Sequence, residues 1–269
     1  MSALLVSLAV VGAVVLLCEL GRWAAGRYLP GARGTYLREL VSTLQLCWCA
    51  SELKLLGDAS GALPLHVRLT LLYVVTLVHL VTFREASCSF IPPLERVCRG
   101  ESSVRAAAAL VSCQLLAALA AQPAAVLVWS RGWSEVHATH RRFGYKCFDP
   151  LGGTVLEAAA AELICSFIIQ AVVLHLHKLE PKLRVHALSA AITALVYAGG
   201  AISGAVLNPV LALSLQFPCS GHSYLQYMFV YWLGPTLGVA SCNLLFEIIL
   251  PFLCGRSSIA VETHKQKTQ

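Results

Sequence analysis

"SGAVLNPVLALSL", residues 203–215, decides the fold, because a single Asn-Pro pair interrupts an otherwise apolar run. The chain has only two asparagines, Asn208 and Asn243. Asn is a preferred residue just before a helix, and Pro is favoured at the first helical position. The local sequence leaves two interpretations open. Either a short helix begins at Pro209 as a re-entrant half-helix, or the pair forms a proline kink in one long span.

The composition around this stretch is that of an integral membrane protein. The 269 residues are 57% hydrophobic and 13% charged, whereas a soluble domain carries about 25% charged residues. We read the formal net charge of +6 as topology, and we expect no nucleic-acid partner. The sequence has no Gly-rich phosphate loop, no Cys-x-x-Cys pair and no His-Glu-x-x-His helix, so we expect no enzyme, cofactor or metal. Seven apolar stretches are long enough, or nearly so, to cross a hydrocarbon core of about 30 Å: 3–25, 36–56, 66–83, 104–129, 155–177, 186–206 and 224–253.

The first apolar stretch has two possible origins. It lacks a basic segment before it and a clear cleavage pattern after it. A retained membrane helix is therefore favoured over a signal peptide.

Lysine and arginine predict the orientation, because cytosolic loops carry the excess of these residues. With a lumenal N-terminus and seven spans, the lumenal side holds six of the 20 Lys and Arg residues and the cytosolic side holds the rest. The six are Lys54, Arg68, Arg131, Arg141, Arg142 and Lys146. This split predicts a cytosolic C-terminus.

An internal repeat divides the chain. "RELVSTLQLC" at 38–47 and "AELICSFIIQ" at 161–170 both place a Glu, and a hydroxyl four residues later, near the start of an apolar span. On a helix these two side chains share a face. A carboxylate within a span is costly and usually faces the bundle interior. Glu39 and Glu162 at matching positions favour a duplicated channel or transporter over two glutamates that only cap their own helices.

These motifs together resemble the aquaporin, or major intrinsic protein, family. "SGAVLNPVLALS", "YWLGPTLG" at 231–238 and the two glutamates carry the family likeness. "LVYAGGAISGAVLNP", "CSGHSYLQY", "KLRVHAL" and "LQLCWCASELKLL" are similar to its superaquaporin branch. The resemblance covers roughly residues 36–253. It implies an all-α membrane protein with the aquaporin fold, which has six core transmembrane helices and two re-entrant half-helices. Here the first half-helix is degraded and an extra N-terminal hydrophobic helix is added.

The resemblance also implies a division of the chain. Residues 1–35 form the extra helix and a basic loop, and residues 36–253 form the channel domain. Its halves are about 36–150 and 155–253, and residues 254–269 form a cytosolic tail.

The resemblance assigns roles to individual residues. Asn208 and Pro209 match the family's half-helix motif, Val210 replaces its Ala, and Leu211 stands where the family usually has a cation-rejecting Arg. Either Val196 or Tyr197 occupies the selectivity position of the fifth core span. All six are expected to line the pore, with Asn208 orienting the permeant, while Glu39 and Glu162 hold carbonyls of the re-entrant loops.

The first half-helix motif has no clear counterpart. The repeat predicts it near residue 85, within "TFREASCSFIPPLERVCRGESS" at 82–103, which contains no Asn. One alignment places Ser89-Phe90-Ile91 on the motif, and a small gap places Ile91-Pro92-Pro93 there. The resemblance therefore supports the fold more firmly than it supports water conduction.

Two further features lie outside the spans. Cys147 and Cys219 fall in the two loops that flank the pore mouth, where an oxidising lumen permits a disulfide, with free thiols or an intersubunit bond as alternatives. The chain ends "KQKTQ", so that Lys265 and Lys267 match a dilysine signal for return to the endoplasmic reticulum by a retrieval coat, although a plain basic tail is the alternative.

The sequence therefore predicts a channel in the lipid of the endoplasmic reticulum membrane, and the family resemblance implies that it is a homotetramer. It would pass water and small neutral solutes such as glycerol or hydrogen peroxide. The alternative is a non-conducting scaffold or assembly protein with the same fold. A seven-span receptor explains neither the repeat nor the Asn-Pro half-helix.

Overall fold

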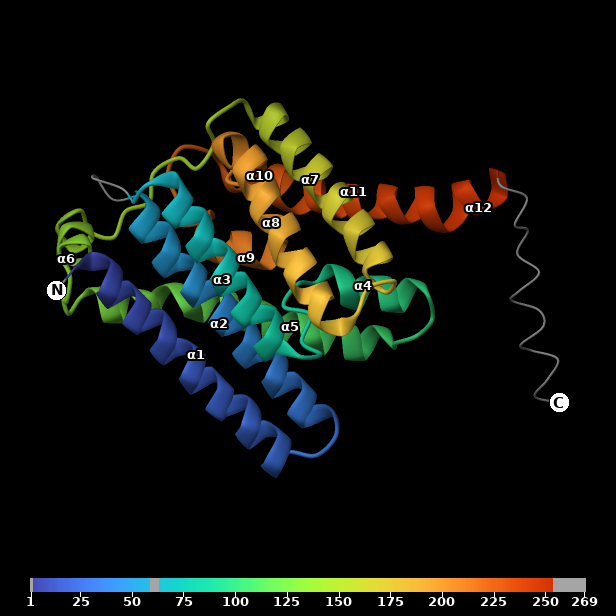
Figure 1. The fold of residues 1–269 in the computed structure, drawn as a ribbon, viewed down its shortest axis with the longest axis horizontal. Coiled ribbons are helices and arrows are strands. Elements are labelled where there is room, and N and C mark those ends of the chain that lie inside the picture. Colours follow the sequence, from blue (N-terminus) through green and yellow to red (C-terminus); the bar gives the residue numbers. More distant parts are fainter. Residues whose placement is uncertain (1, 59–62, 254–269) are drawn as a thin grey trace.

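The structure is a computed structural model that describes residues 2–58 and 63–253, and this part of the chain is helical with no strand (Figure 1). Each of the seven expected apolar stretches corresponds to a helical segment, although 155–177 and 186–206 extend past the ends of their helices at Leu176 and Ser203. The elements in chain order are α1 (Ala3–Tyr28), α2 (Ala32–Asp58), α3 (Leu65–Phe83), α4 (Ile91–Cys98), α5 (Val104–Trp129), α6 (Glu135–Arg142), α7 (Val155–Leu176), α8 (Pro181–Ser203), α9 (Pro209–Leu215), α10 (Tyr224–Met228), η1 (Phe229–Leu233), α11 (Gly234–Asn243), η2 (Leu244–Ile249) and α12 (Leu250–Leu253).

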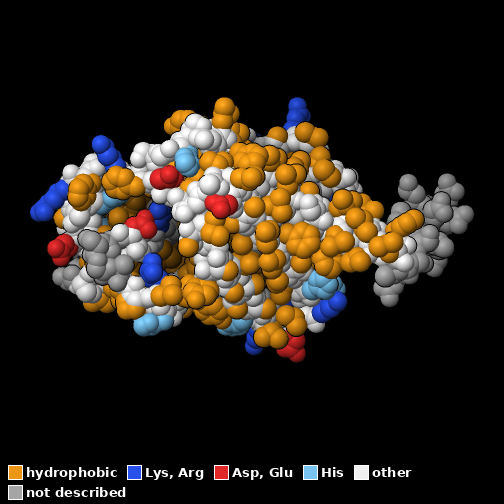
Figure 2. All heavy atoms as spheres, turned by 90° about the horizontal axis from the view of Figure 1, so that it is seen from above, with side chains coloured by type: hydrophobic (Ala, Val, Ile, Leu, Met, Phe, Trp, Pro, Cys, Tyr) orange, Lys and Arg blue, Asp and Glu red, His pale blue; other side chains and the backbone are white. Residues whose placement is uncertain are grey.

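Six of the helical segments are long and apolar enough to cross a membrane. They are α1, α3, α5, α7, α8 and the continuous stretch Tyr224–Leu253. Helix α2 is 27 residues long but more polar, and at 1.5 Å per residue it is long enough to complete the seven expected spans. Hydrophobic side chains cover most of the face shown in Figure 2. Such a surface suits lipid rather than water.

The order of the elements repeats, as the two glutamates predicted. A long helix with a buried Glu (α2 or α7), a second span (α3 or α8), a short helix (α4 or α9) and a further long helix (α5 or α10–α12) follow one another twice. Helix α2 packs against α5 in the first half, and α7 packs against α11 in the second. Contacts between α3 and α8 join the two halves. This duplicated arrangement confirms the predicted fold.

Helix α9 is a separate half-helix, so the proline-kink interpretation is wrong. Helix α8 ends at Ser203 and is capped by Gly204, whose φ of +83° lies in the left-handed region that favours glycine. Ala205 and Leu207 also have positive φ. Asn208 then adopts an extended conformation and Pro209 occupies the first turn of α9. Residues 204–208 are not helical and separate the two helices, whereas a kink would leave one continuous helix.

Helix α4 is the short helix of the first half. Pro92 and Pro93 lie in its first turn, as expected for prolines that start a helix. Two of the charged residues that follow, Glu95 and Arg99, have partners. Glu95 accepts hydrogen bonds from Gln170 of α7 and Asn243 of α11, and Arg99 forms an ion pair with Glu247 of η2. A charged side chain inside a membrane is costly unless it has a partner. These contacts give Glu95 and Arg99 such partners.

Helix α1 lies along the outside of the bundle against α2 (Figure 1). A row of buried residues on α1, including Val6, Val10 and Val14, packs with Cys49 of α2 and Val75 of α3. The extra helix therefore has a packed face of its own.

Two buried polar contacts fix α1 at its two ends. Near its start, the Ser7 hydroxyl donates to Glu52 of α2 at 2.6 Å. Trp129 of α5 and His137 of α6 also bind that carboxylate, at 2.6 and 2.9 Å. Near its end, Arg22 is 3% exposed, and it donates to Gln45 of α2 at 2.8 Å. None of these contacts was predicted from the sequence, although a Glu and an Arg within apolar runs were the available signal.

Candidate functional site

Asn208 lies where the second re-entrant segment turns into α9. Its Oδ1 accepts the backbone N–H groups of Val210 at 3.0 Å and of Leu211 at 3.4 Å. This satisfies two of the backbone donors that every helix start leaves without a partner. The side-chain amide nitrogen remains free to act elsewhere.

Glu162 of α7 holds the segment before Asn208. The carboxylate is fully buried and accepts from the backbone N–H groups of Val206 at 2.9 Å and Leu207 at 2.8 Å. The hydroxyl of Ser203 donates to it at 2.7 Å. Three donors converge on one buried charge, which is the arrangement that makes such a charge tolerable.

Glu39 of α2 does the same for the first re-entrant segment. It accepts from the backbone N–H groups of Ser87 at 3.1 Å and Cys88 at 2.7 Å. Gln114 of α5 also donates to Glu39 at 2.7 Å and reaches the Ser89 carbonyl at 2.9 Å. The expectation that Glu39 and Glu162 hold loop carbonyls is therefore wrong in its chemistry. An ionised carboxylate can only accept, so it binds N–H and O–H groups, and Gln114 contacts the carbonyl instead.

Gln114 was missed by the sequence analysis. It is fully buried on α5, an apolar span that contains one other amide, Gln122. An amide within an apolar span was the available signal.

The two glutamates show which residues of the two re-entrant segments correspond to each other. Glu39 binds the N–H groups of residues 87 and 88, and Glu162 binds those of 206 and 207. The second residue of each pair has a left-handed φ, +51° at Cys88 and +58° at Leu207. Ser89 is thus the counterpart of Asn208. This register selects Ser89-Phe90-Ile91 over Ile91-Pro92-Pro93 as the equivalent of Asn208-Pro209-Val210.

A hydrogen bond joins the two re-entrant segments. The Asn208 side-chain amide donates to the carbonyl oxygen of Cys88 at 2.8 Å. This bond crosses between the halves, since its partners are 120 residues apart in sequence. Asn208 therefore lies where the two segments meet.

The residues after Asn208 differ in their surroundings. Pro209 and Val210 are buried, and Val210 packs with Cys47 of α2 and with Ala118 and Ala121 of α5. The neighbours of Val210 are therefore those of a packed core. Leu211 is half-buried at the edge of the same cluster.

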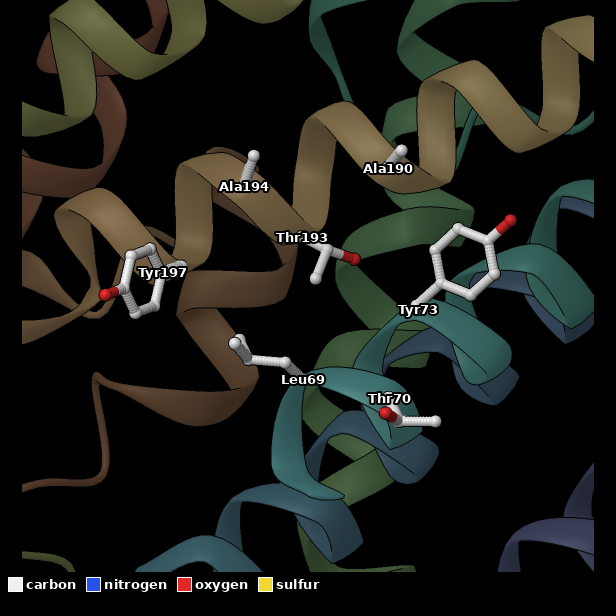
Figure 3. Close-up of a pocket in the computed structure, with 7 residues that line it drawn as sticks. All are labelled: Leu69, Thr70, Tyr73, Ala190, Thr193, Ala194 and Tyr197. Atoms are coloured by element: carbon white, nitrogen blue, oxygen red, sulfur yellow. The ribbon is translucent and has the colours of Figure 1, made fainter. Parts of the chain in front are cut away.

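Val196 and Tyr197 of α8 also differ. Tyr197 is 62% exposed. It lines an open groove of about 440 Å³ between α3 and α8, together with Leu69, Tyr73 and Thr193 (Figure 3). Val196 is half-buried. Of the two candidates, Val196 is the one turned further into the protein.

Cys147 and Cys219 form a disulfide with a Cα–Cα distance of 4.4 Å. The backbone N–H of Ser220 also donates to the Cys147 carbonyl at 3.0 Å. These contacts fasten the loop before α7 to the loop after α9. Lys265 and Lys267 lie outside the described residues. Within residues 2–58 and 63–253, no group of three His, Cys, Asp or Glu side chains is arranged to hold a metal ion.

Comparison with known proteins gives consistent results. A family model described as major intrinsic protein matches residues 95–246. Aquaporin-11 of Equus caballus and of Homo sapiens are each 38% identical, with 94% of this chain and 93% of each relative covered. Aquaporin-12 of Mus musculus is 32% identical, covering 100% of this chain and 94% of its own. A crystal structure of the aquaglyceroporin from Plasmodium falciparum has a TM-score of 0.62 at 16% identity, over 81% of this chain and 98% of that one.

Proposed function

Since the chain belongs to the major intrinsic protein family, the family of the aquaporins, and is a multi-pass membrane channel, we propose that it passes water and small neutral solutes across an intracellular membrane. Glycerol and hydrogen peroxide are included among these solutes. The resemblance to the superaquaporin branch is confirmed, because the curated relatives are aquaporin-11 and aquaporin-12. These relatives are channels and not enzymes, and the chain is a channel likewise.

The position of Asn208 is the observation that carries this proposal. Its oxygen is occupied by α9 and one N–H by Cys88, and an amide nitrogen carries two N–H groups. The second N–H is available to a solute at the point where the two halves meet. Because it can only donate, it binds an oxygen atom of the solute and so orients the molecule.

The residues around Asn208 suit uncharged solutes. Leu211 stands where the family usually has an arginine, so this part of the path carries no fixed charge. Val196 is our choice for the selectivity position of the fifth core span. Ions are excluded by the cost of leaving water in an apolar passage, while polar neutral molecules lose far less.

Glu39 and Glu162 act indirectly in this proposal by holding the two re-entrant segments. Pro209 and Val210 support α9 through packing. We place residues 1–35 outside the channel domain of 36–253, whose halves are about 36–150 and 155–253. We place residues 254–269 in the cytosol.

The proposed location is the endoplasmic reticulum membrane. Support comes from Lys265 and Lys267, which match a retrieval signal, and from the excess of Lys and Arg on the side assigned to the cytosol. Family resemblance supports a homotetramer in which each subunit has its own path.

The test is stopped-flow permeability of proteoliposomes to water, glycerol and hydrogen peroxide. We expect the wild-type protein to exceed empty vesicles and Asn208→Asp to fall to their level, because a carboxylate cannot donate to Cys88 or to the solute. Leu211→Arg should reduce glycerol flux more than water flux, and Leu211→Met should change neither. Wild-type flux equal to that of empty vesicles, with protein shown to be inserted and folded, rejects the channel.

A non-conducting scaffold is the second candidate, and Phe90 favours it. Phe90 occupies in the first half the position that Pro209 occupies in the second. Its ring centroid lies 5.3 Å from that of Trp232. A bulky ring near the meeting point of the re-entrant segments narrows any path there. An intact oligomer without flux, and a Phe90→Ala variant that still does not conduct, would support the scaffold.

A further inference from the structure

The two half-helices differ in how they are packed along their lengths. The buried residues of α9 extend from Pro209 in its first turn to Ser214 near its end. Helix α4 packs against α5, but its buried residues, Ile91 and Pro93, both lie in its first turn. From Leu94 onward no residue of α4 is buried. Burial of apolar side chains therefore holds the start of α4 and contributes much less to its second half.

Asn243, the chain's second asparagine, contacts this second half of α4. Its side-chain amide nitrogen donates to the Glu95 carboxylate. Gln170 of α7 donates to the Asn243 oxygen at 2.9 Å and to the same Glu95 oxygen at 3.3 Å. All three side chains are half-buried. Each is bonded to the other two, so displacing any one of them breaks two hydrogen bonds.

A second contact follows along the same two helices. Arg99 lies one turn after Glu95 on α4, and its guanidinium pairs with Glu247 at 2.6 Å. Glu247 lies in η2, the π-helical turn that directly follows Asn243, and turns of this kind are frequent at functional sites. Among the described residues, the hydrogen bonds that join α4 to the second half all involve Glu95 or Arg99.

We propose that Asn243 and Glu247 are positioning residues of this channel, which hold the second half of α4 and thereby keep the first re-entrant segment in its conducting position. Helix α4 has eight residues and a length of about 12 Å, so a displacement of its end is passed on to the segment that precedes it. The second re-entrant segment has no such dependence, because α9 is packed along its length. The inference rests on the proposed channel function and adds the residues through which the last helix acts on the first half.

Amide hydrogen exchange of α4, with α9 as the internal reference, tests the inference together with water permeability of proteoliposomes. Asn243→Ala leaves the Glu95 carboxylate with Gln170 alone. Exchange in α4 should rise by roughly fivefold, about the effect of one lost hydrogen bond, and water permeability should fall. Exchange in α9 should keep the wild-type rate, because the two helices open separately. Ser241→Ala, at an exposed position of α11, is the matched control.

A charge swap tests the second contact. Glu247→Arg places two cations together and should speed exchange in α4. The double variant Arg99→Glu/Glu247→Arg restores an ion pair with its partners exchanged, so exchange and permeability should return to within about twofold of the wild type. Glu180→Arg is the matched control, because Glu180 is an exposed glutamate just before α8. A residue that stabilised only its own helix would not be rescued by a change on another helix.

Each result decides the inference. Unchanged exchange in α4 of Asn243→Ala or Glu247→Arg, equal acceleration in α4 and α9, or no rescue by the charge swap overturns it. Faster exchange in α4 with wild-type permeability also overturns it and leaves the proposed function standing. Absence of flux in the wild type overturns both. If Asn243→Ala does not insert, Glu247→Arg and the double variant decide alone.

Discussion

At the scale of single residues, each re-entrant segment depends on one buried carboxylate. Glu39 and Glu162 bind consecutive backbone N–H groups that have no helix or sheet to satisfy them. Buried backbone donors without partners cost about as much as a lost hydrogen bond each. The two glutamates therefore make irregular backbone possible inside the membrane, where only buried segments of this kind are tolerated.

Glu162→Gln tests this dependence. The amide keeps one accepting oxygen but turns an NH₂ group toward donors, so at least one of the Val206, Leu207 and Ser203 donors loses its partner. We expect a loss of about 1–3 kcal/mol in stability and a lower apparent midpoint of thermal unfolding in detergent. Glu135→Gln, at an exposed position of α6, should leave the midpoint unchanged. Equal midpoints for Glu162→Gln and wild type would contradict the assigned role.

At the scale of elements, α1 is held by buried polar contacts as well as by apolar packing. Arg22 is almost wholly buried and binds Glu19 of its own helix at 2.8 Å in addition to Gln45 of α2. Glu19 also pairs with Arg84 after α3. Since a buried charge without partners is strongly unfavourable, these contacts are satisfied only while α1 stays against α2 and the end of α3.

Arg22→Met should loosen α1 from the bundle. Methionine retains much of the apolar stem but leaves Gln45 without its charged donor and Glu19 with Arg84 alone. We expect destabilisation of about 2–4 kcal/mol and faster hydrogen exchange over α1 and the facing part of α2. Arg27→Met is the control on the same helix, because Arg27 is exposed and stacks on Tyr28. Unchanged exchange in α1 of the Arg22 variant would show that apolar packing alone holds the helix.

At the scale of the whole molecule, those features of the fold that depend on a local sequence pattern could be predicted. The repeat around Glu39 and Glu162 and the Asn208-Pro209 pair are local signals, and they led to the duplicated fold and the half-helix α9. The counterpart of Asn208 was left open, because Ser89 is identified only by which backbone N–H groups reach Glu39.

Two other features of the candidate site could not be predicted from the sequence, and the reasons are geometric. Val196 and Tyr197 could not be separated because one step along a helix turns a side chain by about 100°, and only the packed bundle shows which of them faces outward. Gln114 has no repeated partner to mark it, and its contact with Glu39 spans 75 residues of sequence.

The disulfide joins the loop before α7 to the loop after α9, and its loss should lower the stability of the whole molecule. The bond closes a sequence separation of 72 residues, for which a stabilisation of about 2–4 kcal/mol is typical. We expect Cys147→Ser, Cys219→Ser and the double variant to lower the unfolding midpoint equally, because all three remove the same bond. Cys98→Ser, at an exposed free cysteine of α4, should have no effect. In the native protein a membrane-impermeant thiol reagent should label neither Cys147 nor Cys219 until a reductant is added. Additive losses in the double variant, or labelling without reductant, would show that the loops are not joined.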